Sequence, residues 1–266
     1  MANADPAIGV IAPGEMGSAV GRVLVDAGRT VLWASEGRSP ASKERADAAG
    51  MTDAGTVEEL AHASAVLLSI VPPHSAMDTA RALAVTGFTG IYVDANAIAP
   101  ATATGIAETV TAKGAIYVDG GIVGPPPTQP GSTRLYLSGE HAKDVAALFT
   151  DTALEAIALD GALTSASALK MTYAAWTKGT TALLLATQAT AQALGVDGAL
   201  EEEWRRSQPN LEQRLPGAHA AADHKGWRWI AEMEEIAATF GAAEQPRGFH
   251  EAAAEVYRNS TRSYSG

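Results

Sequence analysis

The chain has 266 residues, 47% of them hydrophobic, which is enough apolar material for the core of one large domain or two small ones. It carries 19 Lys and Arg against 30 Asp and Glu, and the net charge of -11 argues against general affinity for nucleic acid. The absence of cysteine excludes disulfides and thiolate metal sites. No signal peptide or membrane-spanning run is recognisable, so we expect a cytoplasmic protein without a nucleic-acid or membrane partner.

The first predicted elements are a strand, a glycine-containing turn and a helix. A short apolar strand over Ile8–Ala12 runs into a turn that carries Gly14 and Gly17, and a helix with apolar periodicity comes directly after it. This order is typical of a dinucleotide-binding turn, in which the start of the helix faces a pyrophosphate. Gly14 lets the pyrophosphate approach, and Gly17 lets the helix pack close to the strand. Ala12 replaces the first glycine of the usual motif, so an ordinary strand–turn–helix corner is the alternative.

Strands and helices then alternate up to residue 160. The apolar run Ala65–Val71, for example, is typical of a strand that is buried on both faces of a parallel sheet. The alternation predicts an α/β fold with a Rossmann-type, doubly wound sheet. The strands predicted after the first are Thr30–Ala34, Ala65–Val71, Ile91–Ala95, Ala115–Asp119, Thr133–Ser138 and Leu154–Leu159, and the helices predicted between them are Lys43–Ala49, Met77–Ala84 and Ala101–Lys113.

From Ser165 onward the pattern predicts helices only. A long helix over Ser165–Leu194 comes first, and Pro209, Pro216 and Pro246 are the expected breaks between the later helices. We therefore place a domain boundary near Gly161, between a dinucleotide-binding domain over residues 1–161 and an all-helical domain over residues 162–266. The shorter helices are expected at Ala199–Gln208, Leu211–Leu215, Gly217–Thr239 and Gly248–Asn259.

Four segments and one lysine, in a fixed order, make the chain similar to a known family. The segments are APGEMG at Ala12, SIVPP at Ser69, VDANAIAP at Val93 and DGGIVGPP at Asp119, and Lys170 comes after them on the long helix. The chain resembles the 6-phosphogluconate dehydrogenase and β-hydroxyacid dehydrogenase superfamily, which includes imine reductases. The resemblance implies a Rossmann-type domain, an all-helical domain, and an active site in the cleft between them for a small-molecule substrate. It also implies a homodimer formed through the helical domain.

The resemblance further implies where the cofactor binds, and the residues after the second strand bear on which cofactor it is. A carboxylate there favours NAD(H), whereas an arginine beside a hydroxyl favours NADP(H). The chain has both, but the planar guanidinium of Arg38 next to Ser39 suits a phosphate, so we favour NADP(H) over NAD(H). A solvated surface pair of Glu36 and Arg38 is the alternative. The cofactor-binding candidates are Ala12, Pro13, Gly14, Glu15, Met16, Ser35, Glu36, Arg38, Ser39, Val71, Pro72, Pro73 and Asn96.

Lys170 is the catalytic candidate, because it resembles the catalytic lysine of the family. A ketone under reduction develops alkoxide character, and a nearby ammonium group can stabilise that charge and deliver the proton. Its neighbours in sequence are apolar, and burial among them is expected to lower the pKa of the lysine. A position on a solvated helix face is the alternative. His224 and His250 lack the spacing of metal ligands, and no metal is expected.

The substrate-binding candidates depart from the hydroxyacid dehydrogenase pattern. Ala174 stands where those enzymes usually have an asparagine, and Val123 stands where they usually have a serine. The loop over Gly120–Gly124 is therefore less polar than one that grips a carboxylate, which favours a bulkier or less acidic substrate, or an imine. The spacing around Lys225 is similar to that of a late lysine that family members use near the nicotinamide or the substrate. A surface residue at a helix start is an equally weighted alternative. The candidates are Gly120, Gly121, Val123, Tyr173 and Lys225.

Three functions are compatible with the sequence. The first is an NADP-dependent dehydrogenase or reductase acting on a hydroxyl or carbonyl substrate, with Lys170 as proton donor and acceptor. The second is an imine reductase on the same scaffold. The third is a dinucleotide-binding sensor without turnover, which would need no proton donor.

Overall fold

A computed structural model describes residues 6–262, and the chain divides into two compact units, Met1–Lys170 and Met171–Gly266. The division falls inside a long helix, α7 (Ser165–Ala193). The sequence places the domain boundary before this helix, near Gly161. The predicted fold class is confirmed: a sheet rich in parallel strands, with helices between them, is followed by a helical region.

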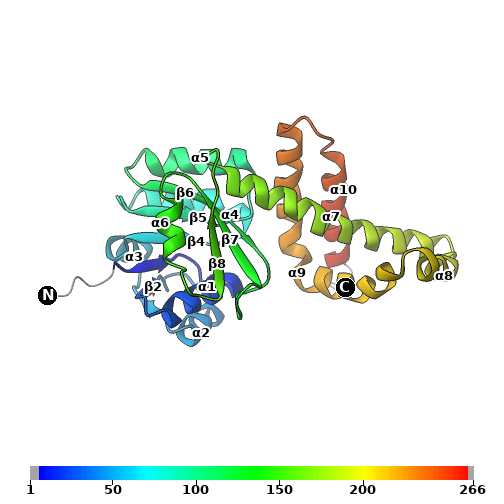
Figure 1. Ribbon diagram of the computed structural model, residues 1–266, viewed down its shortest axis with the longest axis horizontal. Helices are drawn as coiled ribbons and strands as arrows, with labels where there is room; N and C mark the ends of the chain where they lie inside the picture. Colours follow the sequence, from blue (N-terminus) through cyan, green and yellow to red (C-terminus); the bar gives the residue numbers. More distant parts are fainter. Residues whose placement is uncertain (1–5, 263–266) are drawn as a thin grey trace. The chain divides into compact units, whose positions relative to one another are not determined.

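An eight-stranded sheet forms the centre of the first unit (Figure 1), in the order β3-β2-β1-β4-β5-β6-β7-β8. All neighbouring strands are parallel except β6 and β7, which are antiparallel. The carboxyl ends of β1, β2, β4, β5 and β6 therefore meet at one edge of the sheet. The strands are β1 (Ile8–Val10), β2 (Val31–Trp33), β3 (Thr52–Asp53), β4 (Val66–Ser69), β5 (Ile91–Asp94), β6 (Ile116–Val123), β7 (Thr133–Ser138) and β8 (Leu154–Ala158).

Two apolar clusters cover the two faces of this sheet, because successive strand residues point to opposite faces. On one face Leu68 and Val93 pack with Leu24 of α1, and on the other Leu67 and Tyr92 pack with helices α3, α4 and α5. The helices of this unit before α7 are α1 (Glu15–Asp26), α2 (Pro40–Ala48), α3 (Val57–Ala63), α4 (Pro73–Ala84), α5 (Pro100–Thr111) and α6 (Ala142–Ala147).

Short elements account for most differences from the prediction. The sequence pattern did not predict β3, α3 and α6, each no longer than seven residues. Helix α3 does carry a readable start signal: the Thr56 hydroxyl accepts from the N–H of Glu59 at 3.1 Å, and the Glu59 carboxylate accepts from the N–H of Thr56 at 2.9 Å. This reciprocal arrangement is a capping box. Its pattern, Thr followed three residues later by Glu, was present in the sequence.

Strand β6 is longer than predicted. The sequence pattern predicts a strand that ends at Asp119 and a loop over Gly120–Gly124, but the strand continues to Val123. This extension pairs antiparallel with β7, with Gly120 opposite Leu137 and Val123 opposite Arg134. The pairing supplies the backbone hydrogen bonds that overcome the low strand propensity of consecutive glycines.

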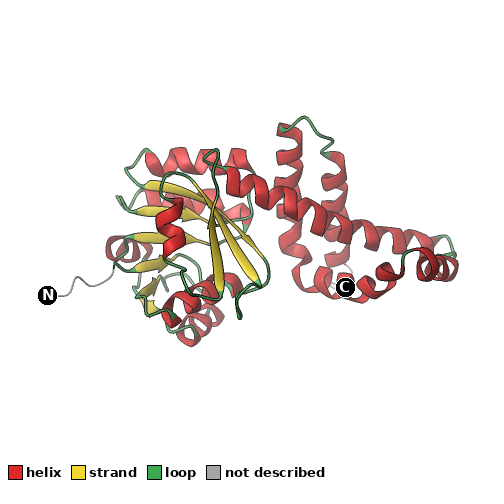
Figure 2. Cartoon of the chain, in the orientation of Figure 1, coloured by secondary structure: helices red, strands yellow, loops and turns green. Residues whose placement is uncertain are grey.

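The second unit is helical over its described residues, as predicted (Figure 2). It contains the greater part of α7, α8 (Asp197–Ser207), α9 (Pro209–Ala242) and α10 (Gly248–Arg262). The break predicted at Pro216 is wrong, because α9 runs through this proline. Leu215, Ala218 and Ala222 are buried on either side of it, and this packing sustains the helix despite the missing N–H. Within residues 6–262, no helix combines the length and hydropathy that a membrane crossing requires.

Candidate functional site

The turn after β1 has the geometry of an anion site. A Cβ atom on Gly17 would lie 2.2 Å from the carbonyl oxygen of Ala12, so only glycine lets α1 approach the strand this closely. A Cβ atom on Gly14 would instead meet no atom within 4 Å. Gly14 is also the N-cap of α1, and no side chain caps the helix there. The open space therefore faces the amide-rich, partly positive end of a helix.

Two arginines converge on the same turn from the segment after β2. The Nη2 atom of Arg38 donates to the carbonyl oxygen of Ile11 at 3.3 Å, and the Nε atom of Arg45 donates to that of Pro13 at 3.0 Å. Ser39 caps α2, since its hydroxyl accepts from the N–H of Ser42 at 3.3 Å. The structure thus brings Arg38 and Arg45 to the β1–α1 turn, whereas the contacts of the Ser39 side chain are with Ser42. Arg45 was not among the predicted site residues.

The acidic side chains of this region, Glu36 and Asp53, are found beside Gly55 and in solvent. Glu36 is exposed, and its N–H donates to the carbonyl oxygen of Gly55 at 3.0 Å. Asp53 accepts from the N–H of Gly55 at 2.8 Å. Slight burial opposes its ionisation, but hydrogen bonds from Gly55 and from the Ser35 hydroxyl outweigh this and lower the pKa of Asp53. The Ser35 side chain is therefore held by a carboxylate. Glu15 and Met16, the two other predicted residues of the first turn, are exposed and half-buried.

The segment after β4 is fastened to the end of β5 by one asparagine. The side chain of Asn96 accepts from the N–H of Val71 at 2.6 Å and donates to Ser69 Oγ at 3.1 Å and to Asp94 Oδ1 at 2.6 Å. Asn96 is 2% exposed. Its side chain thus sets the position of the β4–α4 turn, in which Pro72 is the N-cap and Pro73 the first residue of α4. A role for Asn96 in binding the cofactor remains a prediction.

Two buried carboxyl groups lie side by side at the ends of β5 and β6. Asp94 and Asp119 are register partners in the parallel ladder. Burial raises the pKa of Asp94 to about 7, and the nearby charge of Asp119 adds to this shift against hydrogen bonds from Asn96. Burial likewise raises the pKa of Asp119 to about 6, against hydrogen bonds from Ser167. Neither carboxyl group is among the site residues predicted from the sequence.

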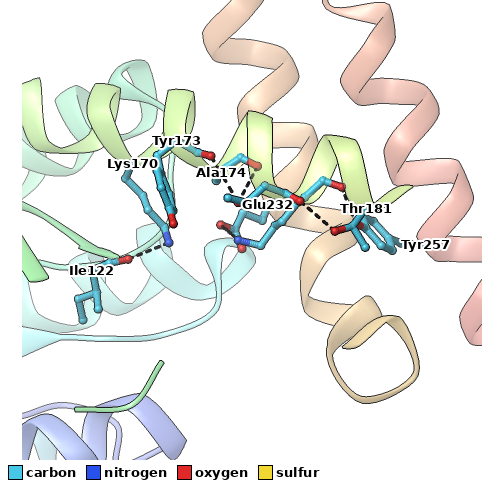
Figure 3. Close-up of polar contacts among 9 residues, drawn as sticks. Ile122, Lys170, Tyr173, Ala174, Thr181, Glu232 and Tyr257 are labelled. Atoms are coloured by element: carbon cyan, nitrogen blue, oxygen red, sulfur yellow. Dashed lines mark hydrogen bonds and ion pairs between the residues drawn. The ribbon is translucent and has the colours of Figure 1, made fainter. Parts of the chain in front are cut away.

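Lys170 lies on α7 and reaches β6 (Figure 3). Its Nζ atom donates to the carbonyl oxygen of Ile122 at 2.8 Å. A Cβ atom on Gly121 would lie 2.9 Å from Lys170 Cβ and 2.8 Å from the carbonyl oxygen of Ala166, so this glycine lets strand and helix touch. Lys170 is half-buried. The catalytic role of Lys170 stays a prediction.

The other predicted substrate-binding residues fall into two groups. Gly120 and Val123 are buried within β6, where a Cβ atom on Gly120 would lie 3.0 Å from the carbonyl oxygen of Asp94. They contact protein, and the expectation of a loop over these residues is wrong because the strand continues to Val123. Tyr173 and Lys225 belong to the second unit. Tyr173 is 47% exposed, and Lys225 lies in the interior of α9 rather than at a helix start.

The second unit contains two features that the sequence analysis did not assign. Lys178 and Glu232 form an ion pair at 2.6 Å, with side chains only 14% and 9% exposed. An apolar groove of about 930 Å³ lies between α7 and α10. Trp176, Leu183 and Phe249 line it and are 73%, 67% and 76% exposed. Within residues 6–262, no cluster of His, Asp and Glu could hold a metal ion.

Two family models match the chain, one in each part. Residues 7–158, more than half of the chain, match the family model described as the NAD binding domain of 6-phosphogluconate dehydrogenase. Residues 191–260 match a domain of unknown function, DUF1932. No protein with a curated description matches the chain.

Solved structures share the fold over nearly the whole length. The conserved protein MTH1747, of unknown function and reported as structurally similar to 3-hydroxyacid dehydrogenases, is 25% identical, with a TM-score of 0.70 and 97% of each chain covered. Mycobacterium tuberculosis 3-hydroxyisobutyrate dehydrogenase is 15% identical, with a TM-score of 0.74 and coverage of 97% and 94%. A reductive aminase from Aspergillus terreus, solved with NADPH and ethyl levulinate, is 18% identical, with a TM-score of 0.60 and coverage of 98% and 95%. These findings confirm the predicted resemblance.

The two glycines of the first turn give a matched pair of variants. Gly17→Ala should lower the free energy of unfolding by about 1–3 kcal/mol, because its methyl group would collide with the backbone of Ala12. Gly14→Ala should cost no more than about 1 kcal/mol, because its methyl group meets no protein atom and only the N-cap preference of α1 is lost, yet weaken NADPH binding about tenfold or more. Chemical denaturation and fluorescence titration measure the two effects. A Gly14→Ala variant that binds NADPH like the parent would show that the open space is not the cofactor site.

Proposed function

The chain belongs to the family defined by the NAD binding domain of 6-phosphogluconate dehydrogenase, and on this premise we propose that it is an NADP(H)-dependent oxidoreductase. It transfers hydride between the nicotinamide and a hydroxyl or carbonyl substrate, with Lys170 as proton donor and acceptor. The observation that carries this proposal is the position of Lys170, whose Nζ atom lies 2.8 Å from the carbonyl oxygen of Ile122 on a strand of the cofactor domain.

The residues of the β1–α1 turn fit the cofactor. The space beside Gly14 leaves room for a pyrophosphate next to the start of α1. The segments after β4 and β5, with Val71, Pro72 and Asn96, end at the same edge of the sheet and would hold the nicotinamide half. When bound, the cofactor supplies or accepts the hydride. The protein has to bind it, orient the substrate and move a proton.

The proposed preference for NADP(H) rests on Arg38 and Arg45. Both guanidinium groups lie at the turn, and each retains donors beyond those used for the backbone carbonyl groups. A 2′-phosphate would accept charge-assisted hydrogen bonds from them. The reductive aminase solved with NADPH shows that this fold accommodates that cofactor.

Lys170 is suited to donate and accept a proton because its Nζ atom is held by a hydrogen bond and its side chain is half-buried. Its ammonium group would stabilise the oxygen that gains negative charge during ketone reduction and would donate the proton to it. In the opposite direction the neutral amine would accept the proton of an alcohol. The hydrogen bond to Ile122 restricts the side chain and so lowers the entropic cost of orienting it.

Imine reduction is the second candidate function. One substitution favours it: Ala174 stands where hydroxyacid dehydrogenases usually have an asparagine, and its methyl group cannot hydrogen-bond a carboxylate. An iminium substrate already carries its proton and needs less from Lys170.

A homodimer is part of the proposal. The groove between α7 and α10 is apolar, and Trp176, Leu183 and Phe249 are exposed together on it. Exposed apolar side chains gathered in this way are typical of interaction sites. A second copy of the chain is the partner we propose, because a two-fold dimer buries the same surface from both subunits.

A substrate panel tests the proposed activity. Ketones, semialdehydes and cyclic imines are each mixed with NADPH and the protein, and the oxidation of NADPH is followed by its absorbance. Turnover of a carbonyl compound supports the first function, and turnover of imines alone supports the second. Tight binding of NADPH without turnover of any class would contradict both and favour a sensor.

Arg38→Ala should weaken NADPH binding about 10- to 100-fold and leave NADH binding within about twofold of the parent, because it removes a charge-assisted contact to the 2′-phosphate. Calorimetric titration with both cofactors measures this. Arg81→Ala is the control, since Arg81 lies in the last turn of α4, away from the carboxyl ends of the strands, and should change neither affinity. Equal losses for NADPH and NADH in Arg38→Ala would show that Arg38 does not read the phosphate.

Lys170→Met should lower the rate constant for ketone reduction by about 10²–10⁴-fold while NADPH affinity changes little, because the variant loses the proton and charge but keeps a long side chain. Single-turnover kinetics and cofactor titration measure the two quantities. Lys113→Met, at an exposed lysine after α5, is the matched control. A Lys170→Met variant with parental rates on ketones would remove Lys170 from the mechanism. A small loss on imines beside a large loss on ketones would identify the imine reductase.

Leu183→Asp should convert the dimer to a monomer, because it places a charge in the apolar groove. Analytical ultracentrifugation at micromolar concentration measures the assembly. Val85→Asp is the matched control, since Val85 is 83% exposed and lies outside the groove. A parent protein that sediments as a stable monomer would refute the proposed dimer.

A further inference from the structure

A row of four buried polar side chains crosses the sheet. The strand register places Ser69 of β4 beside Asp94 of β5, Asp94 beside Asp119 of β6, and Asp119 beside Ser138 of β7. Each of the four residues is at most 1% exposed. Carboxyl groups are costly to bury unless hydrogen bonds compensate for the lost water. The partners of each carboxyl group therefore indicate what it holds in place.

Both oxygens of Asp119 face the start of α7. Oδ2 accepts from the N–H of Ser167 at 2.7 Å, and Oδ1 accepts from the Ser167 hydroxyl at 2.5 Å. Ser138 Oγ lies 3.2 Å from Oδ2 and accepts from the N–H of Ala166 at 3.0 Å. The N–H groups of the first helical turn have no partner within the helix, and a negative charge beside them is favourable. Asp119 and Ser138 thus bind the first turn of α7 to two strands.

Lys170 lies three residues after Ser167 and rests against the same strand. Its Nζ atom donates to the carbonyl oxygen of Ile122, three residues after Asp119 on β6. Between these two points Gly121 brings the strand to within contact of Lys170 Cβ and the backbone of Ala166. A displacement of the first turn of α7 therefore moves the whole side chain of Lys170 relative to β6.

We propose that Asp119 is the positioning residue for Lys170: its carboxylate fixes the first turn of α7 and thereby sets the place of the Lys170 ammonium group on β6. This inference rests on the proposed function, in which Lys170 handles the proton. Asp119 itself moves no proton in the reaction. Its contribution is geometric, and misplacing a catalytic group by about 1 Å can cost on the order of 10²-fold in rate.

Asp94 provides a matched control, because it is as deeply buried as Asp119 but holds a different segment. Its carboxylate accepts from the side chain and the N–H of Asn96 at 2.6 Å and 3.2 Å, and the Tyr117 hydroxyl lies 3.4 Å away. None of these partners is on α7. Replacing Asp94 tests what the loss of a buried carboxylate does to the sheet without touching the start of the helix.

The test compares Asp119→Asn with Asp94→Asn above pH 8, where Asp119, with a pKa raised by burial to about 6, is ionised in the parent. Asp119→Asn replaces one acceptor oxygen by an amide and loses one hydrogen bond from Ser167. Amide hydrogen exchange over residues 166–170 should become about 10- to 100-fold faster, the ratio expected for one hydrogen bond to a charged group. The kcat on the best substrate should fall about 10- to 100-fold, with KM and NADPH affinity within about twofold. Asp94→Asn should leave exchange over residues 166–170 unchanged.

A second readout works without turnover. The rate at which trinitrobenzenesulfonate labels Lys170, measured by mass spectrometry relative to Lys113, should rise in Asp119→Asn and stay parental in Asp94→Asn. If the parent turns over no substrate, the proposed function fails, while this readout still decides whether Asp119 positions Lys170. Should Asp119→Asn not fold, Ser167→Ala removes one of the same hydrogen bonds and should shift exchange and labelling in the same direction by about 3- to 10-fold.

Two results would overturn the proposal. One is parental hydrogen exchange and parental Lys170 labelling in Asp119→Asn. The other is faster exchange at the start of α7 with an unchanged kcat, which would make Asp119 a structural cap without influence on the lysine.

Discussion

The parallel pairing of β1, β2, β4, β5 and β6 is the constraint on which the site depends. A parallel ladder forces the carboxyl ends of all five strands to one edge. The glycine turn after β1, the arginine segment after β2, and the segments after β4 and β5 therefore meet there, although they are far apart in sequence. Close contacts then fix their spacing. Gly17 lets α1 approach the backbone of Ala12, and Arg38 and Arg45 reach back to carbonyl oxygens of the same turn.

The antiparallel pairing of β7 with β6 determines where the start of α7 packs. Because β6 continues past Asp119 to pair with β7, the chain gains a surface on which the start of α7 can rest. Four consecutive strand residues, from Asp119 to Ile122, hold this helix. The carboxylate of Asp119 and the carbonyl oxygen of Ile122 accept hydrogen bonds from it, and Gly121, without a side chain, lets it approach the strand. Lys170 is consequently part of the first unit, although the helix that carries it continues into the second. The proposed cofactor site and the proposed proton donor therefore belong to the same sheet and the helix end that packs on it.

The sequence predicted the fold class correctly, because local pattern and strand order determine it. The turn with Gly14 and Gly17 and the segments after β2, β4 and β5 do lie at one edge of the sheet, and their binding of a cofactor stays a prediction. The predictions were wrong where tertiary contacts determine the secondary structure. The glycine run after Asp119 looks like a loop until β7 pairs with it, and Pro216 looks like a helix end until buried neighbours sustain α9. The contact between Asp119 and the start of α7 was hidden for the same reason, since Ser167, its partner, lies 48 residues along the chain. The sequence shows Arg45 a few residues after Arg38, but only the structure shows that its side chain donates to the carbonyl oxygen of Pro13.

Calorimetric titration of the unaltered protein with NADPH and with NADH tests the central claim most directly. The claim is that the edge of the sheet formed by the β1–α1 turn and the two arginines is a cofactor site that reads the 2′-phosphate. It predicts binding of both cofactors at one site per chain, with NADPH about tenfold or more tighter than NADH. Absence of binding for both, or tighter binding of NADH, would contradict it.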